Sequence, residues 1–238
     1  MKDGLLIGKS VTDEAGQAII TFNVAVDDPG DAELIVSGYN CVPATYNFAF
    51  LPVAGPYVVY AESTVHDPAG NQNNQPDFGE TIQLTNGMRN IGGSDVSNVM
   101  VTLSTSDSYI TLSDSTEVYA FIPAGDTLTI ADAFIFQVSD IVPNGHIVNF
   151  TLKAEAGSTW FSEFTLTCNA PSLTAGGLII DDATGGNGNN RLDPGETVIL
   201  KIPSANNGNS TCFNATGTLT STSPWITILS PVYQLGTL

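Results

Sequence analysis

The chain has 238 residues, of which 24 are acidic and only 6 are Lys or Arg, giving a formal net charge of −18 at pH 7. So acidic a surface repels phosphate backbones, and the clustered basic residues that nucleic-acid binding needs are missing. The hydrophobic content of 42% is too high for a disordered acidic tail, and the longest apolar runs are far too short to cross a bilayer. We therefore expect a folded protein with no nucleic-acid partner and no membrane span.

The first 56 residues predict only about four β-strands, in segments where Val, Ile, Phe and Tyr lie between Gly, Pro and Asp clusters. These strands are expected near Leu5–Lys9, Ala18–Val26, Ala32–Ser37 and Tyr46–Val53. A self-supporting antiparallel sandwich usually needs about seven strands. We therefore interpret residues 1–56 as a partial immunoglobulin-like β-sandwich that has lost its opening strands.

Residues 57–172 predict a complete module, because seven or eight strands in about 115 residues are typical of an antiparallel sandwich. No segment shows a sustained helical period. Thr127–Val138 is expected to be bent or bulged. The expected strands lie near Tyr57–Ala61, Glu80–Thr85, Asn98–Thr105, Tyr109–Leu112, Glu117–Ile122, Thr127–Val138, His146–Ala154 and Trp160–Cys168.

The stretch Gly70–Thr81 occurs again without a gap at Gly186–Thr197, with eight of its twelve positions identical and an offset of 116 residues. A fixed period of this length indicates an array of like modules. Residues 173–238 are therefore the N-terminal part of a second copy, and the predicted fold is all-β, with tandem antiparallel immunoglobulin-like β-sandwiches. The same offset continues in Leu84/Leu200, Asn90/Asn206, Gly92/Gly208, Leu103/Leu219 and Ile110-Thr111/Ile226-Thr227.

The repeated loop concentrates hard oxygen ligands of the kind that Ca²⁺ prefers. Such a density of carboxylates is costly without a compensating positive charge, and the first loop contains no Lys or Arg. The first acid is displaced by one residue between the copies, so two aspartates stay candidates in the second loop. The candidate ligands are Asp67, Asn71, Asn73, Asp77 and Glu80, and in the second copy Asp181, Asp182, Asn187, Asn189, Asp193 and Glu196.

A second interpretation of the loop needs no ion. Asn, Asp and Gly also form Asx turns, in which the side chains cap backbone N–H groups of a long connection. Glu80 and Glu196 fit this interpretation less well, because they lead into strands, where Glu is disfavoured. The sequence favours calcium and leaves the turn interpretation open.

Catalytic signals are weak, so we expect this fragment not to be an enzyme. The histidines, His66 and His146, lie in no recognisable Ser/His/Asp or Cys/His setting. The three cysteines, Cys41, Cys168 and Cys212, show no metal-ligand or redox spacing. Cys168 alternates with apolar residues in an expected strand and is interpreted as a small buried hydrophobe.

Four aromatic residues suggest an alternative function, a recognition module for glycans or proteins. Trp160, Trp225, Tyr109 and Phe161 could together form a sugar-stacking face. Aromatic residues at alternating strand positions belong more often to the core.

Several short motifs resemble the modules that follow the catalytic domain in gingipain-type cysteine peptidases of the Bacteroidetes. The resemblance implies a secreted, extracellular or cell-surface setting and adhesion-type β-sandwiches. It also implies that any peptidase active site lies upstream. The expected partners are neighbouring domains, together with a host or cell-surface protein or glycan. The motifs are Lys2-Asp3-Gly4, Gly8, Val11–Gly16, Val36–Pro43, Gly55–Val58 and Asp77–Glu80.

Overall fold

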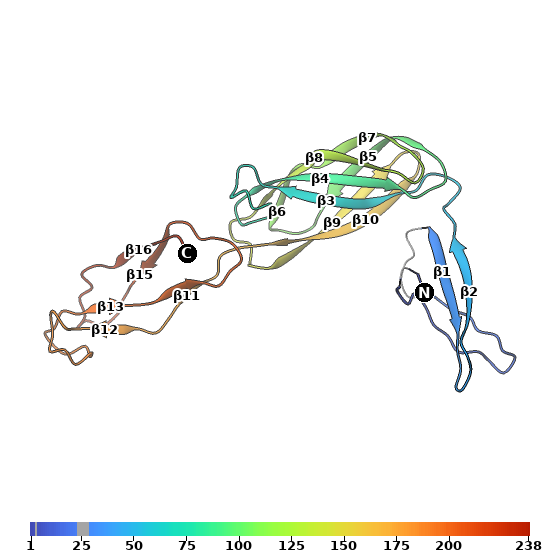
Figure 1. Ribbon diagram of the computed structural model, residues 1–238. Helices are drawn as coiled ribbons and strands as arrows, with labels where there is room; N and C mark the ends of the chain where they lie inside the picture. Colours follow the sequence, from blue (N-terminus) through green and yellow to red (C-terminus); the bar gives the residue numbers. More distant parts are fainter. Residues whose placement is uncertain (3, 23–28) are drawn as a thin grey trace.

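The computed structural model describes residues 1–2, 4–22 and 29–238. The secondary structure of these residues is β throughout, and the strands pair antiparallel, as the sequence predicted. Figure 1 shows a central pair of sheets with a smaller unit at each end. Among the described residues, no helix is long and apolar enough to cross a bilayer.

The N-terminal unit contains one hairpin, formed by β1 (Gly30–Val36) and β2 (Ala44–Phe50). These strands correspond to the last two of the four that were expected. The expected strand at Leu5–Lys9 is not formed, and an isolated bridge joins Lys2 to Leu5 instead. Residues 18–22 are not in a strand, and the rest of the strand expected there, at 23–26, lies outside the described residues.

The central unit holds all eight strands expected between residues 57 and 172, in two four-stranded sheets. Strand β8 is irregular as predicted, because the register of β4 against it shifts between Leu84 and Asn86. One sheet has the order β3 (Val58–His66), β4 (Thr81–Asn90), β8 (Thr127–Val138), β6 (Ile110–Asp114). The other has the order β10 (Thr159–Cys168), β9 (His146–Glu155), β5 (Val96–Ser104), β7 (Thr116–Ile122).

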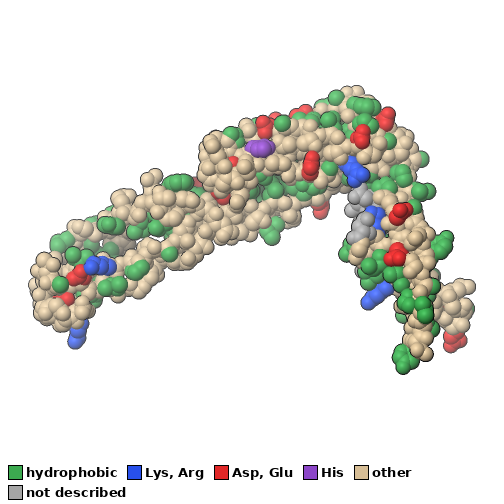
Figure 2. All heavy atoms as spheres, in the orientation of Figure 1, with side chains coloured by type: hydrophobic (Ala, Val, Ile, Leu, Met, Phe, Trp, Pro, Cys, Tyr) green, Lys and Arg blue, Asp and Glu red, His purple; other side chains and the backbone are tan. Residues whose placement is uncertain are grey.

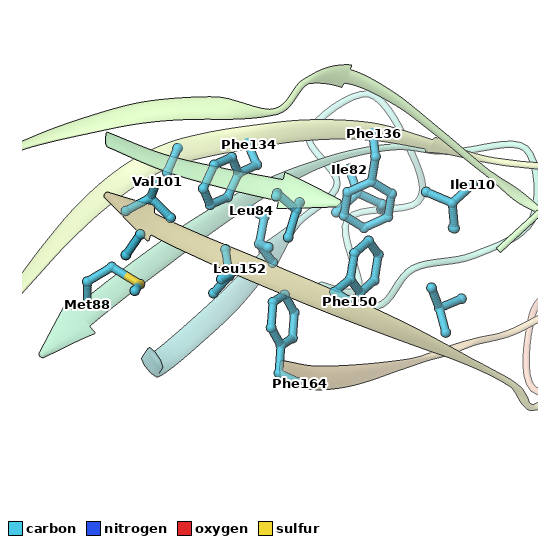
Figure 3. Packing of buried hydrophobic residues seen from close by; sticks show 14 of the residues in the cluster. Ile82, Leu84, Met88, Val101, Ile110, Phe134, Phe136, Phe150, Leu152 and Phe164 are labelled. Carbon is cyan, nitrogen blue, oxygen red and sulfur yellow. The ribbon is translucent and has the colours of Figure 1, made fainter. Parts of the chain in front are cut away.

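The two sheets pack face to face through side chains at alternate strand positions, the arrangement of a β-sandwich (Figure 3). Phe136 of β8 lies 5.3 Å from Phe150 of β9, measured between ring centroids. Phe150 in turn stacks on Phe164 of β10 at 5.2 Å. Because Phe136 and Phe150 come from different sheets, this aromatic row joins the sandwich across its middle.

The C-terminal unit repeats the strand pairing of the first half of the sandwich. Asp181 pairs with Ile199 just as His66 pairs with Gln83, and Leu173 pairs with Asn206 just as Val58 pairs with Asn90. Its strands are β11 (Leu173–Ala175), β12 (Ile179–Asp181), β13 (Ile199–Lys201), β14 (Ser204–Asn206), β15 (Ala215–Thr218) and β16 (Val232–Gly236).

The apolar side chains of this unit are exposed where their counterparts are buried. Val58 is 0% exposed and Leu173 47%; Ile110 is 9% exposed and Ile226 45%. The reason is that the strands of residues 173–238 correspond to β3, β4, β5 and β7 only, so within these residues no strand takes the place of β6, β8, β9 or β10. Hydrophobic side chains are accordingly visible on the surface of both terminal units (Figure 2).

We predict that Phe150→Ala destabilises the central sandwich by about 3–5 kcal/mol, because it leaves a cavity between two fixed rings. Phe161→Ala is the matched control. Phe161 is 66% exposed on the neighbouring strand, so its loss should change the free energy of unfolding by less than about 0.5 kcal/mol. Urea unfolding monitored by tryptophan fluorescence measures both, and similar losses would contradict the packing described here.

Candidate functional site

The first repeated loop folds around the carboxylate of Asp67, which is 1% exposed at the end of β3. The two oxygens of Asp67 accept hydrogen bonds from the backbone N–H groups of Asn73, at 3.2 Å, and Asn74, at 2.9 Å. Asn74 has a positive φ of 59°, a conformation in which Asn is among the better tolerated residues. The loop is therefore wrapped onto an acid that precedes it.

Two further carboxylates complete the loop. Asp77, also 1% exposed, accepts hydrogen bonds at Oδ2 from the side-chain amides of Asn71 and Asn73. Glu80 accepts the backbone N–H groups of Asn71 at 2.9 Å and Asp77 at 3.3 Å. Five of the six carboxylate oxygens of Asp67, Asp77 and Glu80 thus have a donor, and the sixth, Asp77 Oδ1, is buried without one.

The raised pKa of Glu80 shows that the carboxylates of Asp67, Asp77 and Glu80 lie close enough to interact. Burial raises the pKa of Glu80 above its ordinary value, and the negative charges of Asp77 and Asp67 act in the same direction, against the hydrogen bonds from the backbone of Asn71 and Asp77. Ionised Glu80 is therefore less favourable in the folded loop than in the unfolded chain.

The second loop repeats this geometry bond for bond. The carboxylate of Asp182 accepts the N–H groups of Asn189 and Asn190, at 3.0 and 3.1 Å. The amides of Asn187 and Asn189 donate to Asp193 Oδ2, at 3.1 and 2.8 Å. Glu196 accepts the N–H groups of Asn187 and Asp193. The amide hydrogen bonds lower the pKa of Asp193, which is half-buried where Asp77 is fully buried.

The structure explains the displacement of the first acid between the copies. Asp182 takes the place of Asp67, because one extra residue lies between Asp182 and Gly186, and the strand pairs before the loop match at an offset of 115. Asp181 lies outside the hydrogen-bond network of the loop. Its carboxylate pairs with Lys201 Nζ at 2.6 Å, and this hydrogen bond lowers the pKa of Asp181.

The hydrogen bonds of both loops have the form of the Asx turns that the sequence left open. Asn71 Oδ1 accepts the N–H of Asn73, and Asn73 Oδ1 accepts the N–H of Gln75, at 3.0 and 2.8 Å. The described residues contain no group of three or more His, Cys, Asp or Glu side chains placed to hold a metal ion by themselves. A cation at either loop would therefore also need amide or backbone oxygens, which Ca²⁺ accepts.

An asparagine at the end of β4 ties each module to the chain that enters it. Asn90 is fully buried, and its Oδ1 accepts the N–H groups of Tyr57 at 3.0 Å and Gly92 at 3.1 Å. Its amide nitrogen donates to the carbonyls of Ser94 and Ile122. Gly92 is required there, because a Cβ would lie 2.2 Å from the carbonyl oxygen of Gly55. The entering chain thus lies directly on a glycine backbone.

Asn206 forms the same arrangement one module later. Its Oδ1 accepts the N–H groups of Ser172 and Gly208, both at 2.9 Å, and its nitrogen donates to the carbonyls of Ser210 and Leu238. A Cβ on Gly208 would lie 2.2 Å from the carbonyl oxygen of Ala170. The identity of these Asn and Gly residues between the copies was visible in the sequence, but their role in fixing the junction was not.

The first acidic loop lies against this junction. An isolated bridge pairs Asp77 with Asn169, the residue after β10, and Phe78 N–H donates to the Asn169 carbonyl at 2.9 Å. The Asn169 amide donates to Gln75 Oε1 at 2.7 Å. The loop that opens a module is therefore fastened to the segment that leaves it, and this contact buries Asp77.

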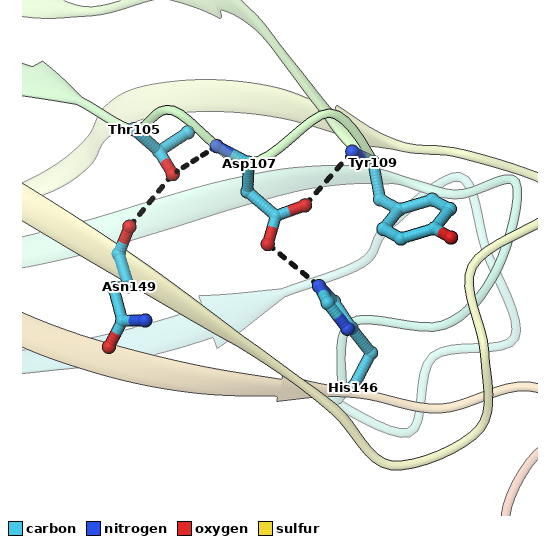
Figure 4. A network of polar contacts seen from close by, with 5 residues as sticks. All are labelled: Thr105, Asp107, Tyr109, His146 and Asn149. Carbon is cyan, nitrogen blue, oxygen red and sulfur yellow. Dashed lines mark hydrogen bonds and ion pairs between the residues drawn. The ribbon is translucent and has the colours of Figure 1, made fainter.

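His146 and Asp107 meet at the end of the sandwich where β9 begins (Figure 4). His146 Nε2 lies 2.7 Å from Asp107 Oδ2, and the Tyr109 ring meets the imidazole edge-on. Cys168 is the register partner of His146. Burial raises the pKa of the Cys168 thiol to about 11, with the charges of Asp107 and Asp77 acting in the same direction. A reactive cysteine needs a lowered pKa and access to solvent, and Cys168 is 1% exposed, the buried hydrophobe that was predicted.

The four aromatic residues singled out in the sequence do not form one face. Trp160 is 7% exposed and belongs to the core, whereas Phe161, the next residue of β10, is exposed on the outer side. Tyr109 packs beside His146, and its counterpart in the second copy is Trp225, which is 92% exposed. A single sugar-stacking surface built from all four is therefore wrong.

Comparison with known proteins gives no family assignment. No family model matches the chain, and no curated protein matches it either.

We predict that Asp67→Ala destabilises the central sandwich by about 2 kcal/mol, because two backbone N–H groups lose their acceptor. The control is Glu163→Ala, which removes one negative charge from an exposed position on β10 and should change stability by less than about 0.5 kcal/mol. Urea unfolding of the two variants measures the loss of stability in each. Equal effects would mean that total charge, and not the loop, is being measured.

Proposed function

We propose that this chain is a segment of a non-catalytic extracellular stalk, built from tandem immunoglobulin-like β-sandwich modules. The observation that carries the proposal is the repeated junction. Asn90 and Asn206 make the same four hydrogen bonds, one to the chain entering the module and three within the module, and Gly92 and Gly208 leave the same close approach for the entering chain. A junction that recurs with the module favours a role that depends on how modules are joined.

The surroundings proposed for the stalk follow from the motifs of the sequence. These motifs resemble the C-terminal modules of gingipain-type cysteine peptidases. We therefore propose that the chain belongs to a secreted or cell-surface protein with adhesion-type modules. The buried thiol of Cys168, whose pKa burial raises to about 11, fits a structural cysteine and not a peptidase nucleophile. The partners of the chain are then the neighbouring domains, together with a host or cell-surface protein or glycan.

We further propose that Ca²⁺ stiffens the acidic loops. In the first loop the buried, unpartnered Asp77 Oδ1 is the atom that a cation would satisfy, with the carboxylates of Asp67 and Glu80 beside it. The corresponding residues of the second loop are Asp182, Asp193 and Glu196. The ion would supply the positive charge that the first loop lacks, and because Asp77 contacts Asn169, it would tie the loop more firmly to the exit of its module.

The test is thermal unfolding with and without calcium. At about 100 times its dissociation constant a ligand adds about 2.7 kcal/mol to the stability of the folded state, which for a module of about 115 residues raises Tm by roughly 10 °C. Extracellular calcium modules bind with dissociation constants on the order of 10⁻⁴ to 10⁻³ M, so 10 mM CaCl₂ against EDTA is a suitable comparison.

Two controls separate a specific site from counter-ion condensation on an acidic protein. MgCl₂ at the same concentration should give a smaller rise, since Mg²⁺ demands a stricter geometry. Asp77→Asn should lose most of the calcium effect. If calcium leaves the melting curve of the wild-type chain unchanged, the loops act as Asx turns alone and the calcium proposal is wrong.

A recognition module is the second candidate, favoured by the 92% exposure of Trp225. Exposed tryptophans are enriched in binding surfaces because the ring is large and carries one polar group. The position of Trp225 favours a packing role instead, because its counterpart Tyr109 is half-buried and packs edge-on against His146. A glycan array probed with the wild-type chain and with Trp225→Ala distinguishes them: binding lost in the variant supports recognition, and a blank array supports the stalk.

A further inference from the structure

The contact between the central sandwich and the C-terminal unit includes one side chain from outside the repeated junction. Asn144 lies in the loop between β8 and β9, and its Oδ1 accepts two backbone N–H groups, from Ala170 at 3.1 Å and from Asn209 at 3.0 Å. Ala170 belongs to the segment between β10 and β11, whereas Asn209 belongs to the C-terminal unit. One carbonyl oxygen therefore joins the sandwich, the connecting segment and the next module.

The loop that carries Asn144 is itself held in place. Gly145 N–H donates to the carbonyl of Cys168 at 3.0 Å, and His146 N–H donates to that of Pro143 at 3.2 Å. Gly145 has a φ of 76°, a conformation that glycine adopts without strain. On the other side, the His146 side chain is bound to Asp107 at 2.7 Å. Asn144 therefore lies in a turn that is held by hydrogen bonds on both sides, and this turn faces the next module.

At the first junction the corresponding N–H group has a different acceptor. The counterpart of Asn209 there is Gly93, whose N–H donates to the backbone carbonyls of Val53 at 2.8 Å and Gly55 at 3.1 Å. At the first junction, backbone carbonyls of the connecting chain accept the N–H of Gly93. At the second junction, the side chain of Asn144 in the preceding module accepts the corresponding N–H, that of Asn209. The second junction therefore depends on the residue type at position 144.

We propose that Asn144 is the residue that sets the orientation of the 173–238 unit on the 57–172 sandwich. This inference rests on the proposed stalk function, which requires that modules keep a fixed relation to one another. Asn206 holds the connecting segment to its own module only, through Ser172. The contacts of Asn169 with the first acidic loop hold the connecting segment to the preceding sandwich, and Asn144 is the side chain that joins that sandwich directly to the C-terminal unit, through Asn209.

The experiment uses the full chain and two substitutions at one position. Asn144→Ala removes the acceptor. Asn144→Asp keeps an acceptor oxygen at the same place, replaces the amide NH₂ with a second oxygen and adds one negative charge, and the two hydrogen bonds across the junction use only the oxygen. Asn149→Ala is the control, an equally exposed asparagine on β9 of the same module. NMR relaxation of backbone ¹⁵N nuclei reports whether residues 57–172 and 173–238 tumble with one correlation time, and hydrogen exchange reports the protection of the Ala170 and Asn209 amides.

We expect Asn144→Ala to abolish the common correlation time and to speed exchange at both amides roughly fivefold or more, the effect of losing one ordinary hydrogen bond. Asn144→Asp and Asn149→Ala should behave as the wild type. Common tumbling that survives in Asn144→Ala overturns the inference and leaves the stalk proposal intact. Loss of common tumbling in Asn149→Ala as well, or in Asn144→Asp, also overturns it.

Recording the wild type in calcium and in EDTA keeps the two proposals apart. Common tumbling in both solutions, lost in Asn144→Ala, supports the amide contact whatever the calcium result. Common tumbling only in calcium would mean that the ion fixes the junction and that Asn144 does not. Independent tumbling of the wild type in both solutions would contradict the stalk itself.

Discussion

The chain that enters each module lies against a buried or half-buried asparagine, whose amide binds both this chain and the backbone of the module. Asn90 binds four backbone groups while fully buried, so neither end of its amide is left unsatisfied. Burying an amide without partners would cost free energy, whereas a fully bonded one fixes the surrounding backbone in a single arrangement. These four hydrogen bonds of Asn90, and the same four of Asn206, position the module boundary. They thereby position β3 and the acidic loop that follows it.

The acidic loops show how a high negative charge is accommodated locally. Backbone and side-chain N–H groups surround Asp67, Asp77 and Glu80, so most of the charge is compensated by hydrogen bonds. The remaining buried oxygen and the raised pKa of Glu80 mark where this compensation is incomplete. The Asx turns shape the loop, and the charge that they leave uncompensated is what the calcium proposal addresses.

A polar contact inside the sandwich could not be expected from the sequence. The side-chain amide of Asn86 donates to the Tyr119 hydroxyl, which donates back to the backbone carbonyl of Asn86, both at 2.9 Å. Burial raises the pKa of Tyr119 to about 12, so the phenol stays neutral. Asn86 and Tyr119 come from different sheets, and their counterparts in the second copy are Ile202 and Leu235. The repeat thus preserves the loop and the junction asparagine while this core pair changes.

The sequence by itself determined the all-β class, the eight strands of the central unit, the period of the repeat and the residues of the two loops. These follow from side-chain alternation and from self-similarity, which are local or periodic properties. Only the tertiary structure decided that Asp182 and not Asp181 replaces Asp67, that Trp160 is buried beside exposed Phe161, and that Asn144 reaches the next module. Each of these depends on strand register or on contacts between residues far apart in the chain, and a shift of one residue in register reverses which side chains face inward.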